Sequence, residues 1–159
     1  MDIGVARVEA QDGGAAKAMS PDLSAFVAHG GKLITYHGTT DGLIPYGNSV
    51  NYYESVVAGG GDRIKENVAL YLVPGMDHCT GGEGAFDVDW LAALEQWDRT
   101  GQKPSALDAR HAALMSDSPF APPTPSKPFA RPVCAYPQTA KYEGAGDGAD
   151  AANWECVAR

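Results

Sequence analysis

Two short apolar runs constrain the fold of this 159-residue chain more than any other feature of its sequence. They are Lys32–Tyr36 (KLITY) and Val68–Val73 (VALYLV), each bounded by glycine or turn-forming residues. Compact runs of apolar and β-branched residues are typical of strands buried in a parallel sheet. Between them, apolar residues recur at helical spacing over Asn48–Ala58, and Gly59–Gly61 is expected to end that helix. The order strand, helix, strand predicts a right-handed crossover unit of an α/β fold.

Further helices are predicted on either side of this unit. Ser20–Asp22 (SPD) supplies an N-cap and a first-turn proline for a short helix that a Gly-Gly pair ends. A longer helix is predicted over Phe86–Thr100, with Trp90 and Trp97 facing the core. A third helix, shorter and less regular in its apolar spacing, is predicted over Ser105–Met115.

The last quarter of the chain has a different composition. From Ser118 onward it is rich in proline and then in glycine. Such a composition predicts little regular structure, so residues 118–159 are expected to form an extended wrap over a larger body. Residues 1–117 are then expected to hold the α/β unit.

Charge and hydropathy exclude several classes of partner. The chain has 20 acidic residues against 12 basic ones, a formal net charge of −8. Because phosphate backbones are bound by clustered lysine and arginine, we expect no nucleic-acid partner. No apolar run approaches the roughly 18 residues of a membrane-spanning helix, so no membrane association is expected. The first ten residues also lack the basic and apolar regions of a signal peptide.

One acid and one base follow the two predicted strands. Asp41 lies just past the end of the first strand, and His78 lies in the loop after the second. Neighbouring parallel strands are about 4.8 Å apart and their carboxyl ends meet at one edge of the sheet, so these two side chains are expected to touch. In hydrolases an aspartate orients an imidazole that takes a proton from a serine. We therefore predict that Asp41 and His78 are the acid and base of a hydrolase site.

A nucleophile for this pair is not evident in the chain. In α/β-hydrolases the triad follows the order serine, aspartate, histidine, and the serine lies in a Gly-x-Ser-x-Gly elbow. No such motif occurs here, and none of the eight serines has the small-residue, strand-to-helix setting that the elbow requires. The nucleophile is therefore expected to lie upstream, in sequence outside this chain.

Other residues near the strand ends have more general assignments. Leu43 and Ile44 either line a pocket for an aromatic acyl group or pack in the core, and the sequence does not distinguish these two roles. His37 is expected to order the strand-end turn by hydrogen bonding, whereas His29 and His111 are expected to face solvent. Because no HxH, HExxH or CxxC spacing is present, no metal site is expected.

Three segments of the chain resemble the C-terminal part of the tannase and feruloyl esterase family of secreted serine esterases, which includes mono(hydroxyethyl) terephthalate hydrolases. The segments are residues 21–56, 70–82 and 89–97, and the similarity runs from about Asp2 to the C-terminus. The resemblance implies that His37–Asp41 (HGTTD) carries the triad acid and that Pro74–Cys79 (PGMDHC) carries the triad base. It also implies an α/β-hydrolase fold, of which residues 1–117 are the C-terminal portion.

The chain has an odd number of cysteines, namely Cys79, Cys134 and Cys156. In an oxidising compartment an odd count leaves one thiol whose partner lies elsewhere. The family has a disulfide between the cysteine after the catalytic histidine and a cysteine immediately before the nucleophilic serine. This resemblance assigns Cys79 to that bridge, with its partner outside the chain. The family's C-terminal disulfide implies that Cys134 pairs with Cys156.

The resemblance implies a carboxylic ester hydrolase that is secreted or periplasmic and acts on esters of aromatic acids such as ferulate or gallate. No cofactor is expected, since the family's calcium site lies in an inserted lid that this chain lacks. With an acid and a base but no nucleophile, the chain is expected to be inactive alone. Its expected partner is the missing N-terminal hydrolase portion or a second chain. The alternative is a non-catalytic interaction or structural domain derived from such a hydrolase, oligomeric through its open sheet edge.

Overall fold

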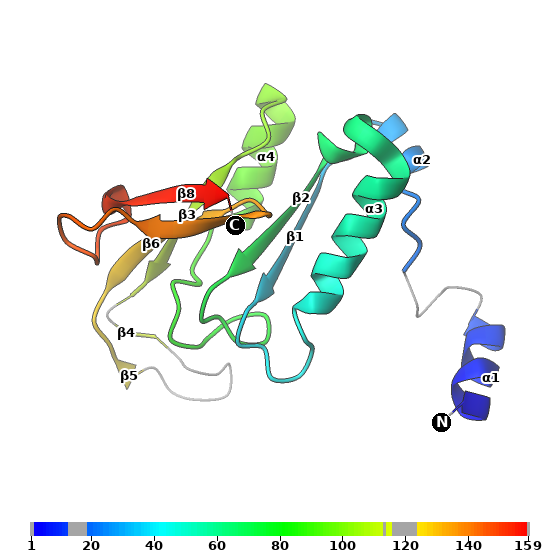
Figure 1. Ribbon diagram of the computed structural model, residues 1–159, viewed down its shortest axis with the longest axis horizontal. Helices are drawn as coiled ribbons and strands as arrows, with labels where there is room; N and C mark the ends of the chain where they lie inside the picture. Colours follow the sequence, from blue (N-terminus) through cyan, green and yellow to red (C-terminus); the bar gives the residue numbers. More distant parts are fainter. Residues whose placement is uncertain (1, 13–18, 113, 116–123, 159) are drawn as a thin grey trace.

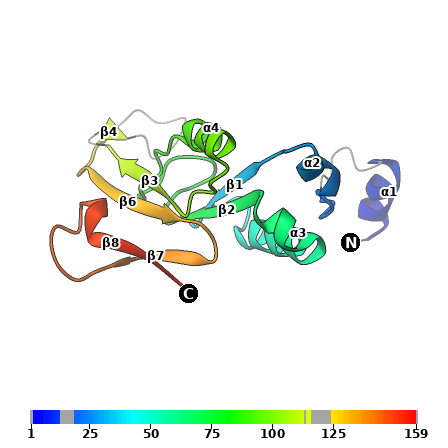
Figure 2. The same cartoon turned by 90° about the horizontal axis from the view of Figure 1, so that it is seen from above.

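A parallel pair of strands forms the centre of the computed structural model, which describes residues 2–12, 19–112, 114–115 and 124–158 (Figure 1). The strands are β1 (Leu33–Gly38) and β2 (Val68–Val73). The other elements, in chain order, are α1 (Asp2–Asp12), α2 (Ser24–Ala28), α3 (Gly47–Lys65), α4 (Trp90–Thr100), β3 (Ala106–His111), β4 (Leu114–Met115), β5 (Thr124–Pro125), β6 (Phe129–Cys134), β7 (Gln138–Tyr142), the 3₁₀ helix η1 (Ala151–Asn153) and β8 (Trp154–Ala158). Figure 2 shows α1 at one end of the molecule and the strands of the C-terminal segment at the other. Within the described residues, no helix has the length and apolar character needed to span a bilayer.

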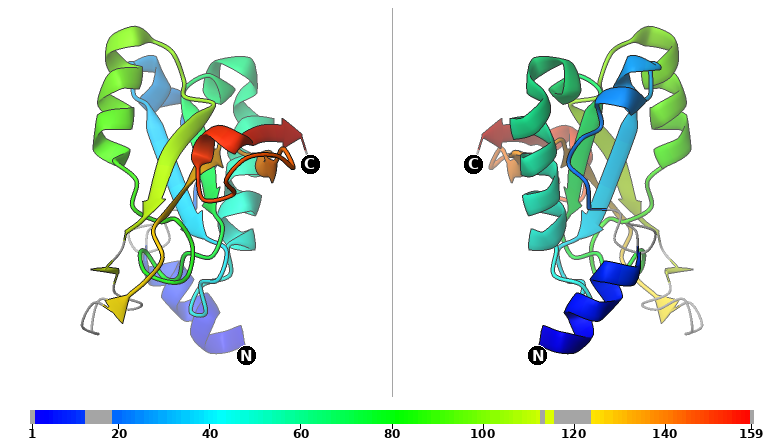
Figure 3. Two further views of the ribbon diagram at one scale, coloured as in Figure 1. Left: turned by 90° about the vertical axis from the view of Figure 1, so that its left-hand side faces the viewer. Right: turned by 90° about the vertical axis from the view of Figure 1, so that its right-hand side faces the viewer.

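The central unit has the predicted α/β topology. β1 and β2 run parallel, in register from Leu33 opposite Val68 to Gly38 opposite Val73. α3 connects the two strands and packs on one side of them, while α4 covers the other side (Figure 3). All six residues of β2 are buried, which is the pattern of a strand covered on both faces. The loops after β1 and β2 therefore emerge side by side at one edge of the molecule.

The three glycines interrupt α3 as predicted, although a short second helical stretch follows the break. The helical segment runs to Lys65 with a kink at Gly61, whose φ of 62° lies in the left-handed region open to glycine. Beyond the kink, Ile64 packs directly against Gly60, where any added Cβ would overlap the isoleucine side chain. Burial of Ile64 beside Val56 and Val68 thus stabilises an extra turn that the local glycine content argues against.

α4 begins later than predicted. Asp87 exchanges two backbone hydrogen bonds of 3.0 Å with Arg110, so the residues before α4 run alongside β3. The helix starts only after Asp89, whose carboxylate caps it by accepting a hydrogen bond from the Ala92 N–H at 2.9 Å. As predicted, Trp97 on this helix faces the core, where it is 1% exposed.

The prediction of a helix over Ser105–Met115 is wrong, since β3 and β4 lie within this segment. β3 pairs antiparallel with β6 from the C-terminal segment, and β4 pairs with β5. The prediction that His111 faces solvent is wrong for the same reason. His111 pairs with Phe129 of β6, and the two rings stack with 4.9 Å between their centroids. Nδ1 of His111 lies 2.8 Å from the Gly84 carbonyl oxygen.

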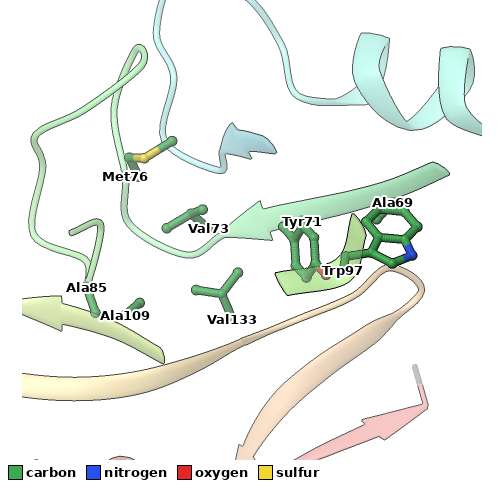
Figure 4. Packing of buried hydrophobic residues seen from close by; sticks show 8 residues of the cluster. All are labelled: Ala69, Tyr71, Val73, Met76, Ala85, Trp97, Ala109 and Val133. Carbon is green, nitrogen blue, oxygen red and sulfur yellow. The ribbon is translucent and has the colours of Figure 1, made fainter. Parts of the chain in front are cut away.

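The C-terminal segment is more regular than its composition predicts. β6 joins β3, and β7 and β8 form an antiparallel pair. Val133 of β6 is 1% exposed and lies in one cluster with Tyr71 of β2 and Trp97 of α4 (Figure 4). Burial of such side chains orders a proline- and glycine-containing segment that has little local preference for structure. The division of the chain at residue 117 stays a prediction.

The disulfide between Cys134 and Cys156 is present, as predicted. It joins the end of β6 to β8, with 5.8 Å between the two Cα atoms and a sequence separation of 22. A bridge of this span restricts the unfolded chain and is worth about 3 kcal/mol in the chain-entropy model. It thereby ties the β7–β8 pair to the strand that enters the core.

Replacing both Cys134 and Cys156 by serine is expected to lower the free energy of unfolding by about 3 kcal/mol. Urea unfolding followed by tryptophan fluorescence measures this change. Cys79→Ser is the matched control, because it removes an exposed thiol that forms no disulfide in the described part of the chain. Equal urea midpoints for the double variant and the control would contradict the stabilising role of the bridge.

Candidate active site

Asp41 and His78 are brought together as predicted. Asp41 Oδ2 and His78 Nδ1 are 2.9 Å apart across the ends of β1 and β2. The Asp41 side chain is 4% exposed, whereas that of His78 is 43% exposed. Within the described residues Nε2 of His78 has no hydrogen-bond partner. The pair thus combines a buried carboxylate with an imidazole that is accessible to another group.

The Asp41 carboxylate is held in its ionised form by three donors. Its Oδ1 accepts hydrogen bonds from the backbone N–H groups of Leu43 at 2.8 Å and Ile44 at 2.9 Å. The Ile44 bond is the largest influence on the pKa of Asp41, and together with the bonds from His78 and Leu43 it outweighs burial and holds that pKa well below 3.8. Because the carboxylate can only accept, the proton on His78 sits on Nδ1, which leaves Nε2 free to act as a base.

The loops that carry the two residues are joined to each other by hydrogen bonds. The Thr40 hydroxyl donates to the Met76 carbonyl at 2.8 Å, and the Thr40 N–H donates to the same oxygen at 3.1 Å. The Thr39 hydroxyl accepts from the Gly75 N–H at 3.1 Å. These bonds fix the relative position of the acid and the base more firmly than their own contact does alone.

Gly38, the last residue of β1, permits the close approach of the two loops. A Cβ at this position would overlap the backbone carbonyl oxygens of Met76 and Asp77. Its φ is not in the left-handed region, so the requirement for glycine comes from space and not from backbone conformation. The sequence HGTTD thus places its glycine where the loop bearing His78 passes.

Cys79 follows His78 on a strained segment of backbone. Its φ of 66° lies in the left-handed region, which is uncommon for residues other than glycine. Its thiol is exposed and forms no disulfide in the described part of the chain. A partner for this thiol in other sequence stays a prediction.

A depression of about 130 Å³ lies at the acid–base pair. It is lined by Tyr36, His37, Gly38, Asp41, Ile44, Met76, His78 and Cys79. Ile44 therefore borders the site, whereas Leu43 is 76% exposed and does not line the depression. Neither residue is buried in this chain, and the role of the two residues in an acyl pocket stays a prediction. Among the described residues, no group of three or more His, Cys, Asp or Glu side chains is placed to hold a metal ion.

Tyr36, Met76 and Ser49 were not identified from the sequence. The sequence around Tyr36 and Met76 has only the features of a strand and of a loop. The two residues come to lie beside His78 because the loops after β1 and β2 meet. Ser49 lacks the setting of a nucleophile elbow, but its hydroxyl lies 2.7 Å from Nδ1 of His37. His37 has the turn-ordering role expected of it, with Nε2 2.9 Å from the Ile44 carbonyl oxygen. The position of His37 in HGTTD, just before Asp41, indicated a turn-ordering role, but the sequence did not identify Ser49 and Ile44 as its partners.

The family model described as "Tannase and feruloyl esterase" matches residues 9–157. The chain is 38% identical over 141 residues to the mono(2-hydroxyethyl) terephthalate hydrolase of Piscinibacter sakaiensis, a match that covers 89% of this chain and 22% of that protein. It is 33% identical over 142 residues to a probable feruloyl esterase of Arthroderma benhamiae, covering 87% of this chain and 25% of that protein. The chain thus spans about a quarter of the length of these relatives.

Solved structures of the same kind share the fold. Feruloyl esterase B from Aspergillus oryzae superposes with a TM-score of 0.70 at 29% identity, covering 94% of this chain and 31% of that one. Tannin acyl hydrolase from Aspergillus niger superposes with a TM-score of 0.63 at 26% identity, covering 89% of this chain and 25% of that one. Because the family model spans nearly the whole sequence and the fold agrees, the chain belongs to the tannase and feruloyl esterase family of serine carboxylesterases.

Proposed function

We propose that this chain supplies the acid and base of a serine hydrolase that cleaves carboxylic esters of aromatic acids. The observation that carries this proposal is the 2.9 Å contact between Asp41 Oδ2 and His78 Nδ1 at the carboxyl ends of two parallel strands. In the reaction, Nε2 of His78 takes the proton of a serine hydroxyl while the serine oxygen attacks the ester carbonyl. Asp41 stabilises the imidazolium, which then gives the proton to the leaving alcohol.

The serine belongs to sequence outside this chain. Support comes from the absence of a Gly-x-Ser-x-Gly elbow among the 159 residues and from the small share of each relative that the chain spans. The exposed thiol of Cys79, next to His78, is placed to form a disulfide with a cysteine adjoining that serine. The chain alone therefore provides proton transfer without a nucleophile and is inactive.

Substrate preference follows from the apolar border of the depression and from the relatives. Ile44 and Tyr36 offer exposed apolar surface beside His78, which suits a flat aromatic group better than a charged one. The names of the relatives refer to terephthalate, feruloyl and tannin esters, all of which contain aromatic acids. The Cys134–Cys156 disulfide supports a secreted or periplasmic location, since disulfides persist in oxidising compartments.

An assay of the isolated chain and of a version extended by its upstream coding sequence tests the proposal. The isolated chain is expected to hydrolyse neither a p-nitrophenyl ester nor methyl ferulate above background. The extended protein is expected to hydrolyse both and to react with a fluorophosphonate probe, which labels activated serines. An extended protein that folds but neither reacts with the probe nor cleaves either ester would support the non-catalytic alternative instead.

A further inference from the structure

We propose that His37 is a positioning residue for Asp41: a neutral imidazole, oriented by Ser49, that fixes the turn carrying the triad acid. The inference rests on the proposed function for its catalytic meaning, although its geometry belongs to this chain alone. His37 is 12% exposed and both of its ring nitrogens face protein groups, so it acts through Asp41 and not on the substrate directly.

The contacts of His37 define which of its nitrogens carries the proton. Nε2 lies 2.9 Å from the Ile44 carbonyl oxygen and 3.2 Å from Asp41 Oδ2, and both of these atoms can only accept. Nε2 must therefore be protonated. Nδ1 lies 2.7 Å from Ser49 Oγ, a hydroxyl that can donate to it. A neutral imidazole with its proton on Nε2 satisfies every contact.

His37, Ile44 and Asp41 are linked in a ring, because each of the three residues contacts the other two. The Ile44 N–H donates to Asp41 Oδ1, and the Ile44 carbonyl in turn accepts from His37. Ser49, near the start of α3, fixes the ring of His37, which itself projects from β1. Three elements are thus joined at one imidazole. Loss of His37 would free Ile44, which supplies a principal hydrogen bond to the carboxylate.

Two imidazoles meet the same carboxylate oxygen, and their surroundings separate their roles. Oδ2 of Asp41 lies 2.9 Å from His78 Nδ1 and 3.2 Å from His37 Nε2. His78 is 43% exposed and can exchange a proton with a substrate, whereas His37 has both nitrogens occupied by protein groups. This geometry assigns the role of base to His78 and leaves His37 to hold the turn that carries Asp41.

Long-range ¹H–¹⁵N correlation spectra of the isolated chain at neutral pH test the assignment without any ester hydrolysis. The expected spectrum shows His37 as a single tautomer with its proton on Nε2. Ser49→Ala is expected to keep the proton on Nε2, because the two acceptors at that nitrogen remain, but to shift the ¹⁵N resonance of Nδ1, because the hydrogen bond from the Ser49 hydroxyl is removed. A wild-type spectrum with the proton on Nδ1 would overturn the proposal, even if every variant failed to fold.

Carbon-detected titration of the Asp41 carboxyl group adds a readout that general loss of stability does not move. In His37→Phe the pKa of Asp41 is expected to rise, because the turn loosens and the N–H beside Oδ2 is lost. His37→Gln, whose amide can donate to Ile44 and accept from Ser49, is expected to restore it. His29→Ala is the matched control, because His29 is an exposed histidine whose Nδ1 lies 2.7 Å from the Ala25 carbonyl oxygen. An unchanged Asp41 titration in folded His37→Phe refutes the positioning role and leaves the proposed function untouched.

Discussion

Replacement of His78 by alanine in the serine-bearing enzyme is expected to lower kcat/KM for methyl ferulate by at least about 1,000-fold. In the proposed mechanism the imidazole removes the serine proton and returns it to the leaving alcohol, and no other histidine in the described part of this chain is placed to take over. His37 lies beside the same carboxylate but has both nitrogens occupied by Ser49 and Ile44. Asp41→Asn is expected to cause a loss of similar size, because an amide N–H facing Nδ1 favours the tautomer with its proton on Nε2.

His29→Ala serves as the matched control for this experiment. His29 is exposed on the turn after α2, where its Nδ1 lies 2.7 Å from the Ala25 carbonyl oxygen. Initial rates over a range of substrate concentrations should be nearly unchanged in this variant, and thermal unfolding should show that all variants are folded. If the enzyme with His78→Ala retained the full rate, the assignment of the base would be wrong.

Gly38→Ala is expected to lower kcat/KM by about 100-fold or more in the same enzyme, although Gly38 takes no part in the chemistry. The added methyl group would overlap the carbonyl oxygens of Met76 and Asp77, which lie on the loop that carries His78. That loop must move away from the end of β1, and displacement of a reacting group by about 1 Å costs on the order of 100-fold in rate. The unfolding free energy is also expected to fall, because overpacked sites are strained by roughly 1–3 kcal/mol.

Gly42→Ala is a close control, since it makes the same chemical change one residue after Asp41. A Cβ at Gly42 would meet no atom within 4 Å, and its φ is outside the left-handed region. Steady-state kinetics of the two variants therefore separate crowding between the loops from any general effect of losing a glycine. Identical kinetics in the two variants would show that the spacing of the loops is not critical.

The sequence predicts the central unit and the acid–base pair because both depend on local signals. The apolar runs of β1 and β2 are long enough to require burial, and a helix between two such strands permits a parallel arrangement. Once the strands are parallel and adjacent, Asp41 and His78 must emerge at one edge of the sheet. Their 2.9 Å contact follows from strand geometry and from residues directly after each strand.

Predictions fail where the partner of a segment is distant in the chain. Residues 105–115 have enough apolar spacing for a helix, but β6 offers residues 106–111 a row of backbone partners and a buried face. His111 is buried for that reason, stacked on a phenylalanine that lies well beyond it in the sequence. The short helical stretch that follows the break in α3 has a similar origin, since burial of Ile64 beside Val56 and Val68 stabilises it.

The sequence by itself determined the α/β class, the two parallel strands and the meeting of Asp41 with His78, because each follows from hydrophobic pattern and position along one short stretch. Only the tertiary structure decided the strand identity of β3, the order of the C-terminal segment and the support of Asp41 by Ile44, His37 and Ser49. These features depend on hydrogen bonds and burial between segments that become neighbours only after the chain has folded. Local propensity carries no information about such partners.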